Sequence, residues 1–243
     1  MNQNITENIN QIQARIENAC QKVGRNPKEV KLLLATKTVN AERIKTALNA
    51  GYTLIAENKV QEVKEKYDAL KDIPHTSHFI GHLQTNKIKE ILRYDIRCIQ
   101  SLDRIELAQK LQQRLAYENK NMDVFIQVNT SNEASKFGIA PEKAIALVQE
   151  VAQFDRLHIK GLMTIGLFSA KSEEVRPCFQ LLKNLQLEIN GLNITNVDVS
   201  ELSMGMSNDL EIAIKEGATI IRVGTAIFGK RIYSDSYYWN ENH

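Results

Sequence analysis

Lys37 is the residue of this sequence whose position most clearly favours reactivity. It ends the apolar run KLLLATK, which begins at Lys31. Apolar surroundings disfavour the charged form of a lysine, and an uncharged amine can condense with an aldehyde to form an imine. A lysine at the end of a strand can equally extend its ammonium group into solvent. Position alone therefore leaves both interpretations open.

A second group of polar residues precedes a short amphipathic segment near the C-terminus. In SELSMGMSNDLEIAIKEG, the residues Ser203, Gly205 and Ser207 come before a predicted helix, whose N-cap we expect at Ser207 or Asn208. Hydroxyl groups and free N–H groups at the N-terminus of a helix bind anions without a basic side chain. The alternative is a capped helix after a tight turn, with no ligand.

The segment TIIRVGT offers two further features. Gly224 permits close approach of the backbone to a ligand, and Thr225 adds a hydroxyl group. Arg222, at the end of a predicted strand, carries a guanidinium group that stays protonated. Placed against a pyridine nitrogen, it would donate a hydrogen bond and oppose protonation of the ring. The alternative is a structural salt bridge with Glu201 or Glu57.

Two residue periods alternate along the chain and predict the elements that position these residues. Isoleucines at three- and four-residue steps from Ile5 to Ile16 predict a leading helix that ends near Gly24. Short apolar runs then alternate with helical patterns, among them 41–50 with Asn40 as N-cap. The expected strands are 31–35, 53–56, 77–80, 96–100, 123–128, 158–163, 196–199 and 218–223.

Strands that alternate with helices predict a parallel sheet with right-handed crossovers. Eight such units fit one α/β domain over residues 1–243, a single (β/α)₈ TIM barrel. Residues 1–24 would form an additional N-terminal helix covering one end, and 232–243 a C-terminal tail. An open, doubly wound sheet is the alternative, but the turn ATKTVN lacks the glycines that usually follow its first strand. In a barrel, the active site lies at the carboxyl ends of the strands.

Composition excludes several classes of function. The net charge of +2 gives no electrostatic footprint for nucleic acid or for an anionic membrane. Three scattered cysteines and a polar N-terminus predict a cytoplasmic protein without a disulfide framework. The histidines at 75, 78 and 82 straddle a predicted strand, so we expect no metal site. Alternating charges over 59–71 predict a solvated helix face.

Several motifs, taken together and in this order, resemble one known family. They are ATKTV at 35–39, AENKVQE at 56–62, HFIGHLQTNK at 78–87, and LSMGMSNDLEIAI with IRVGTAIFG near the C-terminus. The chain is similar to the pyridoxal phosphate homeostasis protein family, a free-standing relative of the N-terminal barrel of bacterial alanine racemase. AENK and GLMTIG depart slightly from the family pattern, without removing an expected cofactor contact.

The resemblance implies a binding site for pyridoxal 5′-phosphate (PLP). It implies a Schiff base on Lys37 and places Arg222 opposite the pyridine nitrogen. The residues that would hold the phosphate are Ser207, Gly224 and Thr225. The residues that would line the pocket are Asn58, His82, Ser203 and Met204. Lys136, in NTSNEASKFG, is a candidate for a second lysine that handles the cofactor.

The remaining question is whether catalysis follows cofactor binding. Racemisation needs a second acid or base opposite the lysine, and in alanine racemase a tyrosine from a separate C-terminal domain supplies it. This chain stops soon after the eighth predicted strand, although the tail tyrosines Tyr233, Tyr237 and Tyr238 could substitute. We therefore expect a monomeric PLP carrier with little or no turnover, which passes PLP to apoenzymes. A PLP-dependent racemase and a cofactor-free aldolase that uses Lys37 are the alternatives.

Overall fold

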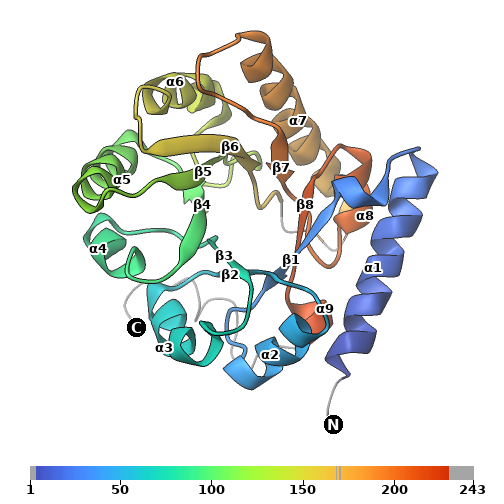
Figure 1. Cartoon of the computed structure of the whole chain (residues 1–243). Helices are drawn as coiled ribbons and strands as arrows, with labels where there is room; N and C mark the ends of the chain where they lie inside the picture. The colour runs from blue at the N-terminus through green and yellow to red at the C-terminus, as the bar shows by residue number, and fades with distance from the viewer. Residues whose placement is uncertain (1–3, 168, 170, 230–243) are drawn as a thin grey trace.

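The strands of the protein form one closed parallel barrel. The computed structural model describes residues 4–167, 169 and 171–229. Each strand pairs with the next in chain order, and the eighth pairs with the first. The helices form a ring outside the strands (Figure 1). The predicted barrel is therefore confirmed, whereas the predicted tail at 232–243 lies outside the described residues.

The order of elements follows the predicted alternation. The strands are β1 Lys31–Ala35, β2 Leu54–Glu57, β3 Thr76–Phe79, β4 Ile96–Leu102, β5 Met122–Gln127, β6 Leu157–Met163, β7 Glu201–Ser203 and β8 Ile220–Val223. The α-helices are α1 Ile5–Lys22, α2 Ala41–Asn49, α3 Val60–Leu70, α4 Ile88–Ile91, α5 Ile105–Glu118, α6 Pro141–Val151, α7 Arg176–Gly191, α8 Leu210–Lys215 and α9 Thr225–Phe228. Short 3₁₀ helices are η1 Pro27–Glu29, η2 Thr85–Lys87 and η3 Ser172–Val175.

The seventh strand is the one that the sequence misplaces. Seven of the eight predicted strands begin and end within two residues of the observed bounds, but β7 is Glu201–Ser203 instead of 196–199. Asn196 has a φ of +63°, which a strand does not accommodate. The carbonyl of Val199 accepts a hydrogen bond of 2.9 Å from Gln186 Nε2 of α7. Val199 is buried beneath α7, so the sequence has an apolar residue here that looks like part of a buried strand.

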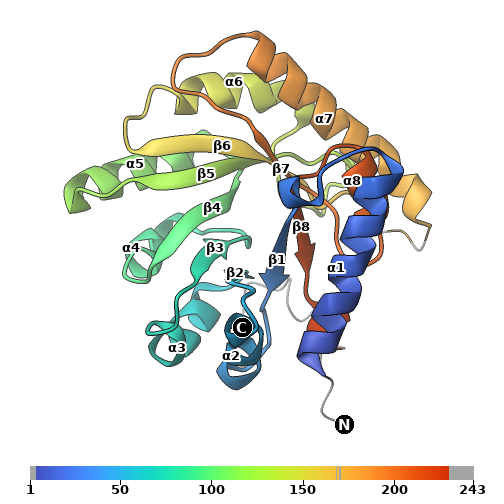
Figure 2. The same cartoon turned by 45° about the vertical axis from the view of Figure 1, so that its right-hand side comes forward.

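The leading helix α1 packs along the side of the barrel and does not cover an end. It contacts α8, α9 and α2, and Figures 1 and 2 both show it beside α8 on the outside of the strands. Its isoleucines Ile5, Ile9, Ile12 and Ile16 are buried, as the period predicts. Arg15 Nε lies 2.7 Å from Glu211 Oε1 of α8 and fixes the helix in this place. The expected position over one end is therefore wrong.

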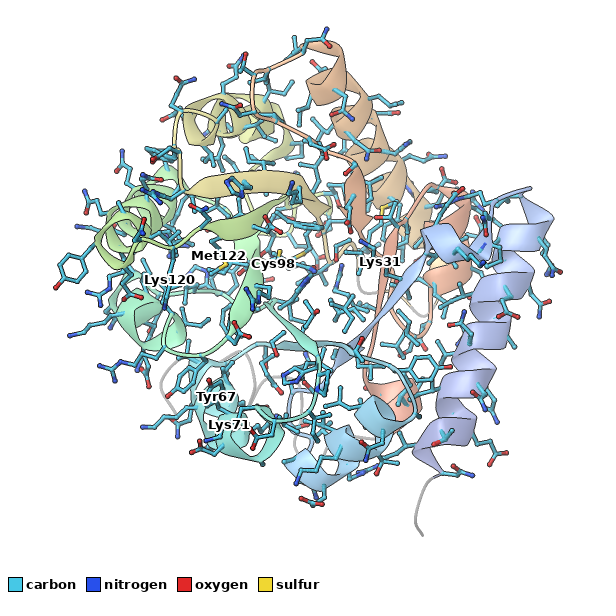
Figure 3. All side chains as sticks on the ribbon, viewed as in Figure 1. Lys31, Tyr67, Lys71, Cys98, Lys120 and Met122 are labelled. Atoms are coloured by element: carbon cyan, nitrogen blue, oxygen red, sulfur yellow. The ribbon has the colours of Figure 1, made fainter. Side chains whose placement is uncertain are left out.

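The barrel interior is filled by side chains. A small apolar cluster, separate from the core between strands and helices, consists of Leu33, Ala56, Cys98, Phe125, Met163 and Ile220. Cys98 and Lys31 lie toward the middle of the ring in Figure 3, whereas Tyr67 lies on α3 and Lys71 is its C-cap. A Cβ atom at Gly161 would lie 2.9 Å from the ring of Phe125 and 2.2 Å from the carbonyl oxygen of Glu201. Glycine at this position therefore lets the ring fill the barrel.

A cavity of about 470 Å³ opens at the amino ends of the strands, at the opposite end from the expected site. Charged groups line it, and Lys31 and Glu201 pair there at 2.6 Å. Among the described residues, no helix is long and apolar enough to span a bilayer. The same residues include no cluster of three or more histidine, cysteine or acidic side chains that could hold a metal ion.

Candidate functional site

Lys37 lies in a tight turn directly after β1. Val39 N–H donates to the carbonyl oxygen of Thr36 at 3.0 Å, which closes a four-residue turn with Lys37 in second place. Thr38, in third place, has a φ of +65°. This φ is typical of the third residue of a type II turn, a position normally taken by glycine. The turn that carries Lys37 thus contains a strained β-branched residue, which the sequence analysis did not foresee.

Three ionisable side chains lie beneath this turn. Lys66 Nζ of α3 lies 2.8 Å from Glu57 Oε1 and 2.7 Å from Glu62 Oε2. Glu57 Oε1 also accepts a hydrogen bond of 2.6 Å from Thr36 Oγ1. The expectation that 59–71 forms a solvated helix face is wrong for Lys66, because only 11% of its side chain is exposed.

The two carboxyl groups of this cluster differ in protonation. Burial raises the pKa of Glu57 to about 8, against the lowering effect of Lys66. Burial also acts on Glu62, but the charge and hydrogen bond of Lys66 outweigh it and lower the pKa of Glu62. At neutral pH the cluster therefore contains one ammonium, one carboxylate and one protonated carboxyl group. This arrangement leaves no net charge buried under the turn.

A chain of hydrogen bonds crosses the barrel from Arg222 to His78. Arg222 Nη1 donates to Ser203 Oγ at 2.8 Å, and Ser203 Oγ donates to Gln100 Oε1 at 2.6 Å. Gln100 Nε2 lies 2.8 Å from His78 Nδ1. Because a guanidinium group only donates, Ser203 must accept there and give its one hydroxyl hydrogen to Gln100. The Gln100 amide nitrogen then donates, so Nδ1 of His78 accepts.

We expect His78 to stay neutral, with its proton on Nε2. Burial, with a contribution from the charge of Lys31, lowers its pKa to about 4. An unfolded histidine titrates near pH 6.5, so the unfolded state binds more protons between about pH 4 and pH 6.5, and stability falls as the pH falls through this window. Imidazole ¹⁵N NMR checks this, and a titration midpoint near pH 6.5 would contradict it.

Arg222 is buried, and within residues 4–167, 169 and 171–229 no carboxylate accepts a hydrogen bond from its guanidinium group. Its second bond, from Nη2, goes to the carbonyl oxygen of Thr164 at 2.7 Å. Burial lowers its pKa to about 10, against the opposite effect of Asp209, so it stays charged at neutral pH. Glu201 and Glu57 pair instead with lysines. The alternative interpretation of Arg222 as a structural salt bridge is therefore wrong.

The loop after β7 begins its helix later than expected. The N-cap of α8 is Asp209, not Ser207 or Asn208, and Asp209 Oδ1 accepts a bond of 2.5 Å from Met206 N–H. Ser207 is half-buried, and its carbonyl oxygen accepts from Arg15 Nη2 at 2.9 Å.

The side chain of Met204 is fully buried in the core between strands and helices. Its N–H donates to the carbonyl oxygen of Ile220 at 3.2 Å. Because the side chain belongs to this outer core, any role of Met204 in lining a pocket falls to its backbone.

The loops after β7, β8 and β1 meet at one edge of the barrel. The N–H of Arg222 donates to the carbonyl oxygen of Gly205 at 3.0 Å. A Cβ atom at Gly224 would lie 2.8 Å from the carbonyl oxygen of Ala35. Glycine at 224 is therefore required by the adjacent end of β1, whatever ligand the loop binds. Thr225, the first residue of α9, is exposed beside it.

The loops after β2 and β3 also touch. A Cβ atom at Gly81 would lie 1.8 Å from the carbonyl oxygen of Asn58. Three buried polar atoms at the carboxyl ends of β2 and β4 have no hydrogen-bond partner among the described residues: Glu57 Oε2, Asn58 Oδ1 and Ser101 Oγ. Buried polar atoms are normally satisfied, so such a cluster indicates a place for water or a ligand.

His82 lies at the same edge, after β3. Its ring stacks on Phe137 with a centroid distance of 4.0 Å, and its Nδ1 lies 3.7 Å from Asp103 Oδ2. Burial raises the pKa of Asp103, but the hydrogen bond from His82 and the charge of Arg104 outweigh it and lower that pKa. His82 is thus positioned by an ionised carboxylate and an aromatic ring.

Lys136 is held within the loops after β5 and β6. Its Nζ pairs with Glu133 Oε2 and donates to the carbonyl oxygen of Gly166 at 2.6 Å. A role in handling a cofactor stays a prediction and would require these contacts to break. The sequence pattern placed Thr164 just past a strand but assigned no role to it or to Gln100, although a polar residue within an apolar strand was a signal for Gln100.

The alanine racemase N-terminal domain family matches residues 3–232 of this chain. A curated relative from Aquifex aeolicus, named pyridoxal phosphate homeostasis protein, is 43% identical over 230 residues, which cover 95% of this chain and all of the relative. The protein of the same name from Escherichia coli is 37% identical and is covered to 98%, with 95% of this chain aligned.

Solved structures agree in fold. PipY of Synechococcus elongatus, with PLP bound, superimposes with a TM-score of 0.78 at 31% identity, over 88% of this chain and all of PipY. Alanine racemase of Clostridium difficile gives a TM-score of 0.74 at 14% identity, over 96% of this chain and 57% of the racemase. The similarity to the racemase concerns the fold alone.

Proposed function

We propose, since this chain belongs to the pyridoxal phosphate homeostasis protein family, that it binds PLP at the carboxyl end of its barrel and serves intracellular PLP homeostasis. The observation that carries the proposal is that Lys37 lies in the turn after β1 while Arg222 lies on β8, the strand paired with β1. Arg222 of β8 is paired with Leu33 of β1, and Lys37 lies two residues beyond the end of β1. PLP carries an aldehyde and a ring nitrogen on one small molecule, so two groups on adjacent strands can engage both.

The residues present fit this cofactor. Arg222 is a buried cation whose hydrogen-bond partners are a hydroxyl and a carbonyl oxygen, which suits a ligand that carries an acceptor and negative charge. The buried atoms Asn58 Oδ1 and Ser101 Oγ lack partners in the described part of the chain, at the edge that holds Lys37. PLP supplies an electrophilic aldehyde and, in enzymes, an electron sink.

The residues of the chain would divide the binding among them. Lys37 would condense with the aldehyde, so that a C=N bond replaces the C=O bond and one water molecule leaves. Arg222 would donate a hydrogen bond toward the ring nitrogen and, as a fixed cation, disfavour a proton there. The loops with Ser207, Gly224 and Thr225 would hold the phosphate through hydroxyl and backbone N–H groups.

We also propose that the protein carries PLP, with little or no turnover. A cation opposite the ring nitrogen weakens the electron sink that catalysis uses, and the curated relatives are named for homeostasis. The four tyrosines in the described part of the chain lie away from the carboxyl end. Tyr52 lines the cavity at the amino end, and Tyr94 comes two residues before the amino end of β4. The ring centroid of Tyr67 lies 5.1 Å from that of Tyr94, and Tyr117 is exposed on α5. We place the carrier in the cytoplasm as a monomer that hands PLP to apoenzymes.

Absorption spectra of the purified protein with PLP test this function. We expect a visible band that borohydride bleaches, a colourless Lys37→Ala variant, and an unchanged Lys31→Ala control at the other end of the same strand. Racemisation of alanine should stay far below the ~1 s⁻¹ of an ordinary enzyme. Turnover at or above that rate would favour a racemase. Borohydride trapping that requires an aldehyde substrate, with no PLP band, would favour an aldolase.

A further inference from the structure

The turn that carries Lys37 needs support from outside its own four residues. Thr38 occupies the left-handed region at a φ of +65°, where a β-branched side chain is strained. Such strain persists only where the surrounding structure determines the conformation. The contacts that do so come from α3.

Helix α3 bonds to both peptide groups that flank Lys37. Lys66 Nζ donates to the carbonyl oxygen of Thr36 at 2.9 Å, which belongs to the peptide group before Lys37. Glu62 Oε2 accepts from Thr38 N–H at 2.6 Å, which belongs to the peptide group after it. The rotations about the Cα atom of Lys37 are thereby restricted on both sides.

The two side chains also stabilise each other. Glu62 and Lys66 pair at 2.7 Å across one turn of the helix, with 14% and 11% of their side chains exposed. A hydrogen bond to an ionised acceptor is shorter and stronger than one between neutral groups. Glu62 therefore holds the strained peptide with a partly buried, charge-assisted bond.

We propose that Glu62, supported by Lys66, is a positioning residue for Lys37. By fixing the two flanking peptide groups, these side chains set the direction in which the amine leaves the backbone and so its approach to the PLP aldehyde. The inference rests on the proposed function, since it assigns a purpose to the support only if Lys37 is the reacting amine. The competing explanation is that Glu62 merely ties α3 to β1.

The test compares Glu62→Ala, Thr38→Gly and the double variant by PLP titration and by the rate at which the visible band appears. We expect Glu62→Ala to weaken PLP binding about tenfold or more. In the double variant, glycine at 38 adopts the turn without support, so affinity should return to within about threefold of wild type. Thr38→Gly alone should bind normally. Glu65→Ala, an exposed glutamate on the same helix, is the matched control.

Each outcome decides a different point. Unchanged affinity in Glu62→Ala, or a loss that Thr38→Gly does not restore, would overturn the positioning role. Failure of the wild type to form a bleachable band would instead overturn the proposed function. If Glu62→Ala does not fold, Glu62→Gln takes its place. This variant keeps an acceptor for Thr38 N–H but loses the charge that strengthens the bond and pairs with Lys66, so the visible band should form more slowly than in the wild type, and an unchanged rate would overturn the positioning role. Thr38→Gly in that background should then restore the rate of band formation, and a rate that stays low would contradict the proposal.

Discussion

Replacement of Arg222 by leucine is expected to lower the free energy of unfolding by about 3 kcal/mol and to weaken PLP binding at least tenfold. The variant leaves Ser203 Oγ and the carbonyl oxygen of Thr164 without the donor that each has now. Asp209 loses the nearby positive charge that opposes the burial effect on its pKa. Urea unfolding and PLP titration measure the two effects.

Two further variants at this position separate charge from shape. Arg222→Lys keeps the charge but cannot bond to both partners, so we expect intermediate stability. Arg222→Glu should favour a proton on the ring nitrogen and shift the visible absorption of bound PLP. A destabilisation below about 1 kcal/mol for leucine would contradict the account of the two buried hydrogen bonds of Arg222. An unchanged spectrum with retained PLP for glutamate would place Arg222 outside the cofactor site.

The second large effect is expected for Lys66→Met. Removing the ammonium leaves Glu57 and Glu62 facing each other in a buried setting, and loss of one partner of a buried ion pair costs about 3–5 kcal/mol. Lys71→Met, at the exposed C-cap of α3, should leave the free energy of unfolding close to that of the wild type, because an exposed ion pair contributes little. Urea unfolding measures both, and equal losses in the two variants would contradict the account of the buried cluster.

The raised pKa of Glu57 makes the free energy of unfolding depend on pH. The folded state keeps its proton up to about pH 8, whereas an unfolded glutamate releases it near 4.5. The folded state thus binds more protons within this window, so the contribution of Glu57 is full at low pH and is lost as the pH rises toward 8. Glu57→Gln should remove that slope, and an identical pH dependence in wild type and variant would argue against a protonated Glu57.

Much of the fold follows from local pattern. Runs such as LLLA at 32–35 are apolar because strands of a parallel barrel are covered on both sides. The alternation of short strands with helical patterns located seven strands to within two residues. The segment around Val199 imitates such a run, because a residue packed under α7 is as apolar as a buried strand. Only the pairing partners, which are distant in sequence, distinguish the two.

Site residues near strand ends could be predicted from the sequence. Residues whose burial or backbone conformation depends on contacts distant in the sequence could not. Lys37 and Arg222 stand out because a charged residue just after an apolar strand, or near its carboxyl end, is unusual. Lys66 does not, since alternating charges on a helix normally face water, and its burial depends on β2 packing beneath it. The positive φ of Thr38 has no local sequence signal, because its support comes from a residue 24 positions away.

The most direct test is to reduce the PLP-loaded protein with borohydride, digest it and locate the modified lysine by mass spectrometry. We predict one pyridoxyl adduct, on Lys37, with Lys136 unmodified at equimolar PLP. An adduct confined to another lysine, or none in a protein that retains PLP, would contradict the central claim that this amine holds the cofactor.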